Sequence, residues 1–128
     1  MNFMQTHPAT QEMAQAATGL LDALTPEQRT EIRFDFADIE RTNWHYVPRR
    51  RAGLPFKALN PEQRLLAQAL LASGLSSWGY GKAVTIMSLE AVLEALEQGH
   101  GPLRDPELYY LSIFGDPRSA QAWGWRAG

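Results

Sequence analysis

The stretch from Glu40 to Phe56 concentrates the side chains that could do chemistry. Its sequence, E-R-T-N-W-H-Y-V-P-R-R-R-A-G-L-P-F, combines one carboxylate, one histidine, four arginines and three aromatic rings. Residues 40–57 carry five basic residues and one acidic residue, a balance of +4, whereas the whole chain has a net charge of −2. A cationic patch on an acidic body suits a small anionic ligand or an acidic peptide. A solvated arginine-rich loop is the alternative interpretation.

Glu40 and His45 are the two side chains of this stretch that could transfer protons in a reaction. Arg49 and Arg51 could bind the carboxylate or phosphate of a substrate, because guanidinium groups match these anions with paired hydrogen bonds. In an extended chain, at most two of the three consecutive arginines point the same way. A purely hydrogen-bonding role for His45 is the alternative to catalysis.

The remaining candidates for substrate binding are aromatic or cationic and are spread along the chain: Arg41, Trp44, Tyr46, Tyr80, Arg104, Trp125 and Arg126. Several have a structural alternative. Arg41 could pair with the neighbouring Glu40, Arg104 opens a turn, and Trp125 could belong to the core instead of a cleft wall. The G-Y-G-K sequence around Tyr80 lacks the spacing of a phosphate-binding loop.

Composition excludes several classes of protein. The chain has no cysteine, so disulfides and zinc–thiolate sites are excluded, and its three histidines lie far apart. We therefore assign no metal ligand and no cofactor within this chain. The low net charge argues against a nucleic-acid-binding protein. No segment resembles a membrane span or a signal peptide, which favours a soluble cytoplasmic protein that does not bind membranes.

Helices are predicted over residues 8–24, 25–34, 60–73 and 77–98. The second and third begin with the look-alike sequences L-T-P-E-Q-R and L-N-P-E-Q-R, in which Thr25 or Asn60 can cap the helix and a glutamine can close a capping box. The expected buried residues are Met13, Ala17, Leu20 and Leu24 in the first helix, Leu65, Leu66, Ala69 and Leu70 in the third, and Ile86, Leu89, Leu93 and Leu96 in the fourth, with Glu90, Glu94 and Glu97 facing water.

Strands are predicted near Phe34 and at 109–114 and 122–126, the last two forming a hairpin around Gly115. The fold class is therefore α+β and helix-dominated, with three to four helices followed by a C-terminal β-hairpin. Residues 1–7 form a flexible tail and residues 8–128 a single domain. A hairpin alone is marginally stable, so it is expected to lie on the helices or to pair with something else. An exposed final strand would also predict self-association of the chain.

Several blocks together resemble one family, a domain of unknown function in longer bacterial and fungal proteins. They are E-R-x-x-W-H-Y-V-P at 40–48, L-S-S-W-G-Y-G-K at 75–82, R-D-P-E-L-Y-Y at 104–110, F-G-D-P at 114–117 and W-G-W-R at 123–126. In that family, W-G-W-R leads into a glycine and a pair of histidines, which this chain lacks. The resemblance implies that residues 8–128 are the N-terminal portion of a larger, two-layer domain that is incomplete here. It also implies a metal or acid–base site in the longer form.

Two functions follow as hypotheses. In the first, the chain is part of a metal-dependent enzyme acting on a small anionic or peptide-like substrate. In the second, it is a non-catalytic binding module that uses the arginine-rich aromatic loop. Convergence of Glu40, His45, Arg104 and Arg126 in one pocket would favour the enzyme. Scattering of these residues, with the arginines 49–51 on an exposed loop, would favour the binding module.

Overall fold

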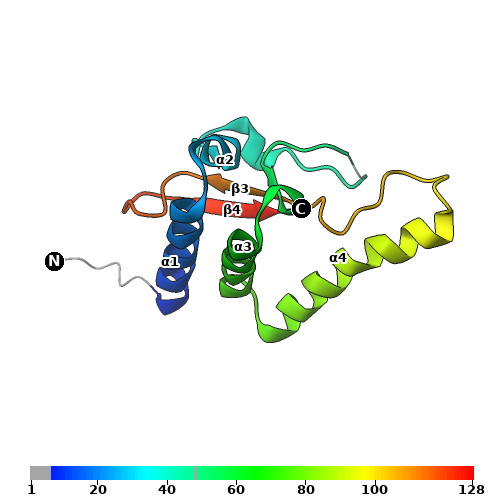
Figure 1. Ribbon diagram of the computed structural model, residues 1–128. Coiled ribbons are helices and arrows are strands. Elements are labelled where there is room, and N and C mark those ends of the chain that lie inside the picture. Colours follow the sequence, from blue (N-terminus) through cyan, green and yellow to red (C-terminus); the bar gives the residue numbers. More distant parts are fainter. Residues whose placement is uncertain (1–6, 48) are drawn as a thin grey trace.

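The computed structural model describes residues 7–47 and 49–128 (Figure 1). Over these residues the helices are α1 (Pro8–Ala23), α2 (Pro26–Ile32), α3 (Pro61–Ser73) and α4 (Ser77–Glu97), with two short 3-10 helices, η1 (Ile39–Thr42) and η2 (Phe56–Ala58). The strands are β1 (Arg33–Phe34), β2 (Leu54–Pro55), β3 (Tyr110–Phe114) and β4 (Gly124–Ala127). The predicted α+β, helix-dominated class is confirmed. None of the helices in the described part combines the length and apolar character needed to cross a bilayer.

The two look-alike helix starts form matching capping boxes that bind each other. The Thr25 side chain caps α2 and the Asn60 side chain caps α3, each with a glutamine at the third helical position, as predicted. Those glutamines, Gln28 and Gln63, also exchange hydrogen bonds with one another at 3.2 and 2.9 Å. Gln63 is buried and donates a further bond to the carbonyl of Ala23. The repeated sequence thus joins the end of α1 to the start of α3.

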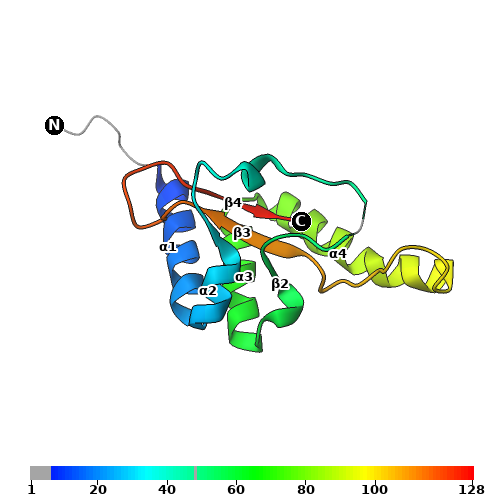
Figure 2. The same cartoon turned by 90° about the horizontal axis from the view of Figure 1, so that it is seen from above.

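β3 is the central strand of a small mixed sheet. On one side it pairs with β4 in antiparallel register, with Ser112 opposite Arg126, which confirms the predicted hairpin. On the other side it pairs with β1 in parallel and with β2 in antiparallel register. The hairpin therefore does not stand alone, because the early strands β1 and β2 supply its second neighbour. Figure 2 shows β2, β3 and β4 side by side above α3.

A glycine allows β2 to lie against β3. Gly53 has φ +114°, and a Cβ atom there would lie 2.6 Å from both the Leu111 carbonyl oxygen and the Ser112 hydroxyl. On the far side of β3, Tyr110 and Gly128 exchange both backbone hydrogen bonds. The alternation of antiparallel pairing then directs the backbone groups of Trp125 and Ala127 away from β3. Self-association through this outer edge of β4 stays a prediction.

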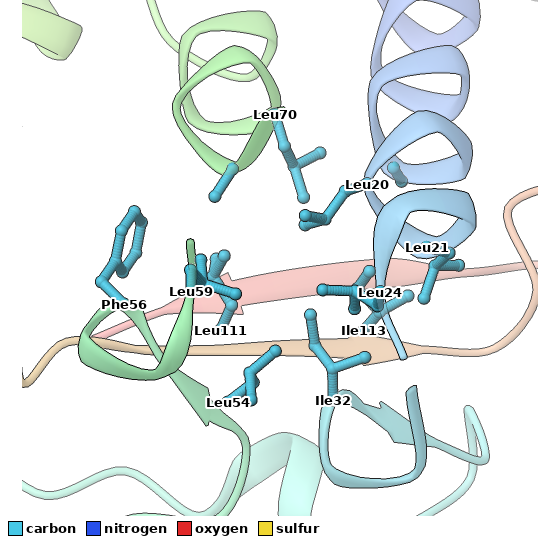
Figure 3. Close-up of a cluster of buried hydrophobic side chains, with 12 residues drawn as sticks. Leu20, Leu21, Leu24, Ile32, Leu54, Phe56, Leu59, Leu70, Leu111 and Ile113 are labelled. Carbon is cyan, nitrogen blue, oxygen red and sulfur yellow. The ribbon is translucent and has the colours of Figure 1, made fainter. Parts of the chain in front are cut away.

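The hydrophobic core lies between the sheet and the α1–α3 helix pair (Figure 3). Ala17, Leu20 and Leu24 are buried on the face of α1 that was predicted. They meet Leu111 and Ile113 of the central strand. The remaining members of this cluster are Leu21, Ile32, Leu54, Phe56, Leu59, Ala67 and Leu70. One continuous core thus includes α1, α2, α3, β2 and β3.

Two predicted buried faces are only partly correct: Leu70 of α3 is buried and Leu66 packs against the core, but other predicted residues are exposed. In α3, Leu65 is 72% exposed and Ala69 is also exposed, whereas Gln63, Ala67, Leu70 and Leu71 are buried. In α4, Ile86, Leu89 and Leu96 are exposed, and no residue of the helix is fully buried. The face of α4 turned toward the molecule carries the glutamates expected in water, because Arg104 pairs with them. The predicted tail lies outside the described residues, except His7, whose side chain caps α1.

Candidate functional site

A cleft of about 560 Å³ lies between the loop before β2 and the segment that leads into β3. The loop contributes Trp44, His45, Tyr46, Arg49, Arg50 and Arg51, and the opposite wall is formed by Glu90, Leu103, Arg104, Asp105, Leu108, Tyr109, Tyr110, Ala127 and Gly128. Six of the predicted site residues therefore line one cleft: Trp44, His45, Tyr46, Arg49, Arg51 and Arg104. This volume is within the range of small-molecule sites.

Arg51 shapes the arginine-rich loop. Its guanidinium donates hydrogen bonds to the backbone carbonyls of His45 at 2.7 Å, Val47 at 3.1 Å and Arg49 at 3.1 Å. Three carbonyls from one segment converge on this side chain, so the loop curls around it. The contacts use its donors but do not neutralise its charge, because carbonyls are dipoles and not anions. Arg51 therefore keeps a positive charge at the cleft.

Arg49 and Arg50 are exposed at the mouth of the cleft. Nη1 of Arg49 lies 3.5 Å from Nδ1 of His45. Within residues 7–47 and 49–128, no carboxylate lies within ion-pairing distance of Arg49, Arg50 or Arg51. An anion that enters the cleft would therefore meet the charges of all three guanidinium groups, with Arg49 and Arg50 best placed to donate hydrogen bonds, because the donors of Arg51 already bind carbonyls.

Arg104, on the opposite wall, is already paired. Its Nε lies 3.0 Å from Glu97 and its Nη1 lies 3.8 Å from Glu90, both from the inner face of α4. The hydrogen bond with Glu97 raises the pKa of Arg104. Burial raises the pKa of the neighbouring Tyr109, and the charge of Glu90 acts in the same direction. Arg104 therefore fixes α4 to the cleft wall. Because Glu97 and Glu90 already neutralise its charge, it would attract an anionic ligand only weakly.

Glu40 and Arg126 meet each other outside the cleft. Arg126 donates to the Glu40 carboxylate at 3.0 Å, to its backbone carbonyl at 2.6 Å and to the Asn43 carbonyl at 3.0 Å. Burial raises the pKa of Glu40, but hydrogen bonds from Asn43 and Arg126 outweigh it, so the net shift is downward. The pair fixes the η1 segment to β4 and so sets where the following loop begins.

The other predicted site residues lie elsewhere. The guanidinium of Arg41 stacks 4.1 Å above the Phe36 ring, and the ion pair with Glu40 is made by Arg126 instead. The hydroxyl of Tyr80 donates to Gln68 between α3 and α4. The indole of Trp125 packs against Gly74, where a side chain would collide with it. Trp125 also packs against the core cluster, which was the structural alternative considered for it.

Several residues of the cleft were not predicted as site residues. Tyr109, Tyr110 and Asp105 follow Arg104 in the R-D-P-E-L-Y-Y block, so that block was the available signal. The helical periodicity predicts that Glu90 is exposed to solvent, because its partner Arg104 lies outside the helix and does not enter that pattern. The described residues bring no group of three His, Asp or Glu side chains together as a metal site would, and we derive no metal-dependent step from them.

Comparison with known proteins identifies the family. Residues 6–128 match the family described as "Protein of unknown function (DUF3500)", and the chain belongs to it. No curated protein and no solved structure shows significant similarity to the chain.

Proposed function

We propose that the cleft binds a small anionic ligand that carries a flat or aromatic group. The observation that carries this proposal is the set of three guanidinium groups, Arg49 to Arg51, at the cleft. The carboxylates that also line the cleft, Glu90 and Asp105, pair with Arg104 and Lys57 instead, and among the described residues none forms an ion pair with the three arginines. Trp44, Tyr46 and Tyr109 line the same cleft and offer apolar surface to a ring. Guanidinium groups bind carboxylates and phosphates through paired, charge-assisted hydrogen bonds.

The same geometry supports binding better than catalysis. Of the two candidate proton carriers, only His45 lines the cleft, whereas the Glu40 carboxylate is held by Arg126 and Asn43. The lowered pKa of Glu40 also makes it a weaker base. An enzyme built around both residues would need them within reach of one substrate. An enzyme role for a longer form of the protein stays a prediction.

Titration calorimetry with phenyl phosphate tests the proposal, with benzyl alcohol as a neutral ligand of similar shape and inorganic phosphate as an anion without a ring. We expect phenyl phosphate to bind more tightly than either. The double variant Arg49→Gln, Arg50→Gln should weaken that binding roughly 10-fold to 100-fold, since a hydrogen bond to a charged group contributes about 1.5–3 kcal/mol.

The double variant Arg33→Gln, Arg118→Gln provides the matched control, because it also removes two exposed positive charges, neither of which lines the cleft. Its affinity for phenyl phosphate should equal that of the wild type. Equal weakening by both sets of substitutions would mean that the anion responds only to net charge. An acidic peptide that binds when phenyl phosphate does not would refute the small-molecule proposal and favour the peptide-binding alternative.

A further inference from the structure

The outward face of α4 is more apolar than the face that packs against the protein. The partly buried positions of α4 are 79, 80, 83, 87, 90, 93, 94 and 97, and they include Leu93 but also three glutamates. On the outward side, Trp78 is 81%, Ile86 57%, Leu89 45%, Val92 50% and Leu96 74% exposed. Figure 1 shows α4 running away from α3 at the margin of the molecule. This distribution is the reverse of that of an ordinary surface helix.

The outward residues also have the spacing of a helix-pairing seam. Positions 78, 82, 85, 89, 92 and 96 alternate steps of four and three residues, and all six are exposed. This is the repeat that keeps one stripe of a helix against a partner helix. Lys82 is the single charged residue in the seam. A membrane-surface helix would instead carry many basic residues beside its apolar face.

The seam has a hollow at one end and a projecting side chain at the other. The hollow is lined by Ser77, Trp78, Gly81, Lys82, Thr85 and Ile86. The hollow is open at Gly81, because a Cβ atom added at this position would have no neighbouring atom of the described residues within 4 Å. Leu96 lies four turns further along the same stripe. A helix of this shape is complementary to a second copy of itself in antiparallel orientation.

We propose that two copies of this chain associate through the outward faces of α4, packed antiparallel about a two-fold axis near Leu89. Each Leu96 then fills the hollow beside Gly81 of the other copy, so the same surface serves both subunits. A parallel pair would place the two Lys82 charges together, whereas the antiparallel pair separates them and aligns the helix dipoles favourably.

The available surface is close to what a stable dimer needs. The exposed fractions, taken with about 100 Å² per aliphatic side chain and about 200 Å² for tryptophan, give about 400 Å² of apolar surface. Interfaces are about 60% apolar, so this corresponds to about 650 Å² per partner. Standard interfaces bury about 600–1,000 Å² per partner. The α4 face is therefore large enough to hold a homodimer.

Light scattering coupled to size-exclusion chromatography tests the proposal on the chain of residues 1–128. At about 100 μM we expect a mass of twice 14.4 kDa, and Leu96→Lys should raise the dimer dissociation constant at least tenfold, because it places a second ammonium group beside Lys82 in each hollow. Gly81→Gln should act similarly by filling the hollow. Leu65→Lys is the matched control, since Leu65 is about as exposed as Leu96 but lies on α3, and it should leave the dimer intact.

Circular dichroism melting shows whether each variant still folds, which is expected because all three positions are solvent-exposed. A monomeric mass for the wild type at every concentration would overturn the proposal. So would a dimer that survives Leu96→Lys, which would direct attention to the outer edge of β4. Equal loss of dimer in Leu96→Lys and Leu65→Lys would also overturn it, since the effect would then not depend on the α4 face.

Discussion

Replacing Gln63 by alanine should cost far more stability than an ordinary polar-to-alanine change on a helix. Gln63 is 4% exposed, and its amide joins the two capping boxes. It accepts from the Asn60 backbone at 3.0 Å, donates to the Ala23 carbonyl at 3.0 Å and exchanges two hydrogen bonds with Gln28. Truncation therefore removes these partners from the partly buried Ala23 carbonyl, the Asn60 N–H and the Gln28 amide.

The expected cost follows from these contacts. Leaving a buried polar group unsatisfied costs about 1–3 kcal/mol, so Gln63→Ala should lower the free energy of unfolding by about 2–4 kcal/mol. Gln28→Ala should cost less, about 1–2 kcal/mol, because Gln28 is only half-buried. The double variant should lose about 1 kcal/mol less than the sum, since both single variants remove the same pair of bonds.

Urea denaturation of the wild type, both single variants and the double variant measures this coupling. Gln11→Ala provides a control, because Gln11 is an exposed residue of α1 and should change stability by less than about 0.5 kcal/mol. Additivity of the two substitutions within about 0.3 kcal/mol would refute the coupling of the capping boxes.

Three further changes test how the loop and the sheet are held. Arg126→Gln should destabilise the chain by about 2–4 kcal/mol in chemical denaturation, because it leaves the 17% exposed Glu40 carboxylate without its cation; an effect below about 0.5 kcal/mol would contradict the anchoring role. Because folding lowers the pKa of Glu40, its ionised carboxylate stabilises the folded state at pH values above its ordinary pKa of 4.5. This stabilisation is lost as the pH falls through the pKa of the folded state. Between about pH 5 and pH 3, Glu40→Gln should therefore lose less stability than the wild type, whereas parallel curves would show that Glu40 is not linked to folding. Gly53→Ala should lower the thermal midpoint and cost at least about 1–3 kcal/mol because of its φ of +114°, and a neutral effect would mean that β2 can shift away from β3.

Local motifs made the helices predictable from the sequence. Thr25 and Asn60 cap their helices through contacts three residues away, so the sequence around each one was sufficient. The bond between Gln28 and Gln63 spans 35 residues, and nothing in the two look-alike sequences indicates that they face each other. β1 lies at the predicted position near Phe34, whereas β2 contains only two residues, too few for an alternating pattern.

The candidate site was predictable only in part, for the same reason. Its loop stands out in the sequence because the arginines and aromatic rings are contiguous. Whether a charged residue of this loop is neutralised depends on ion-pair partners that come from distant segments of the chain. Arg126 reaches Glu40 across 86 residues, which removes both from the cleft. Periodicity identified an apolar stripe on α4 but could not tell whether the molecule itself covers it.

Two-dimensional NMR of the arginine Nε–Hε groups during a titration with phenyl phosphate tests the anion-binding cleft most directly. We expect the signals of Arg49, Arg50 and Arg51 to shift and to saturate together, and the binding affinity to fall as salt is added. The signals of the paired Arg104 and Arg126 should change little. Uniform small shifts across all arginines, or shifts centred on Arg33 or Arg118, would contradict this expectation.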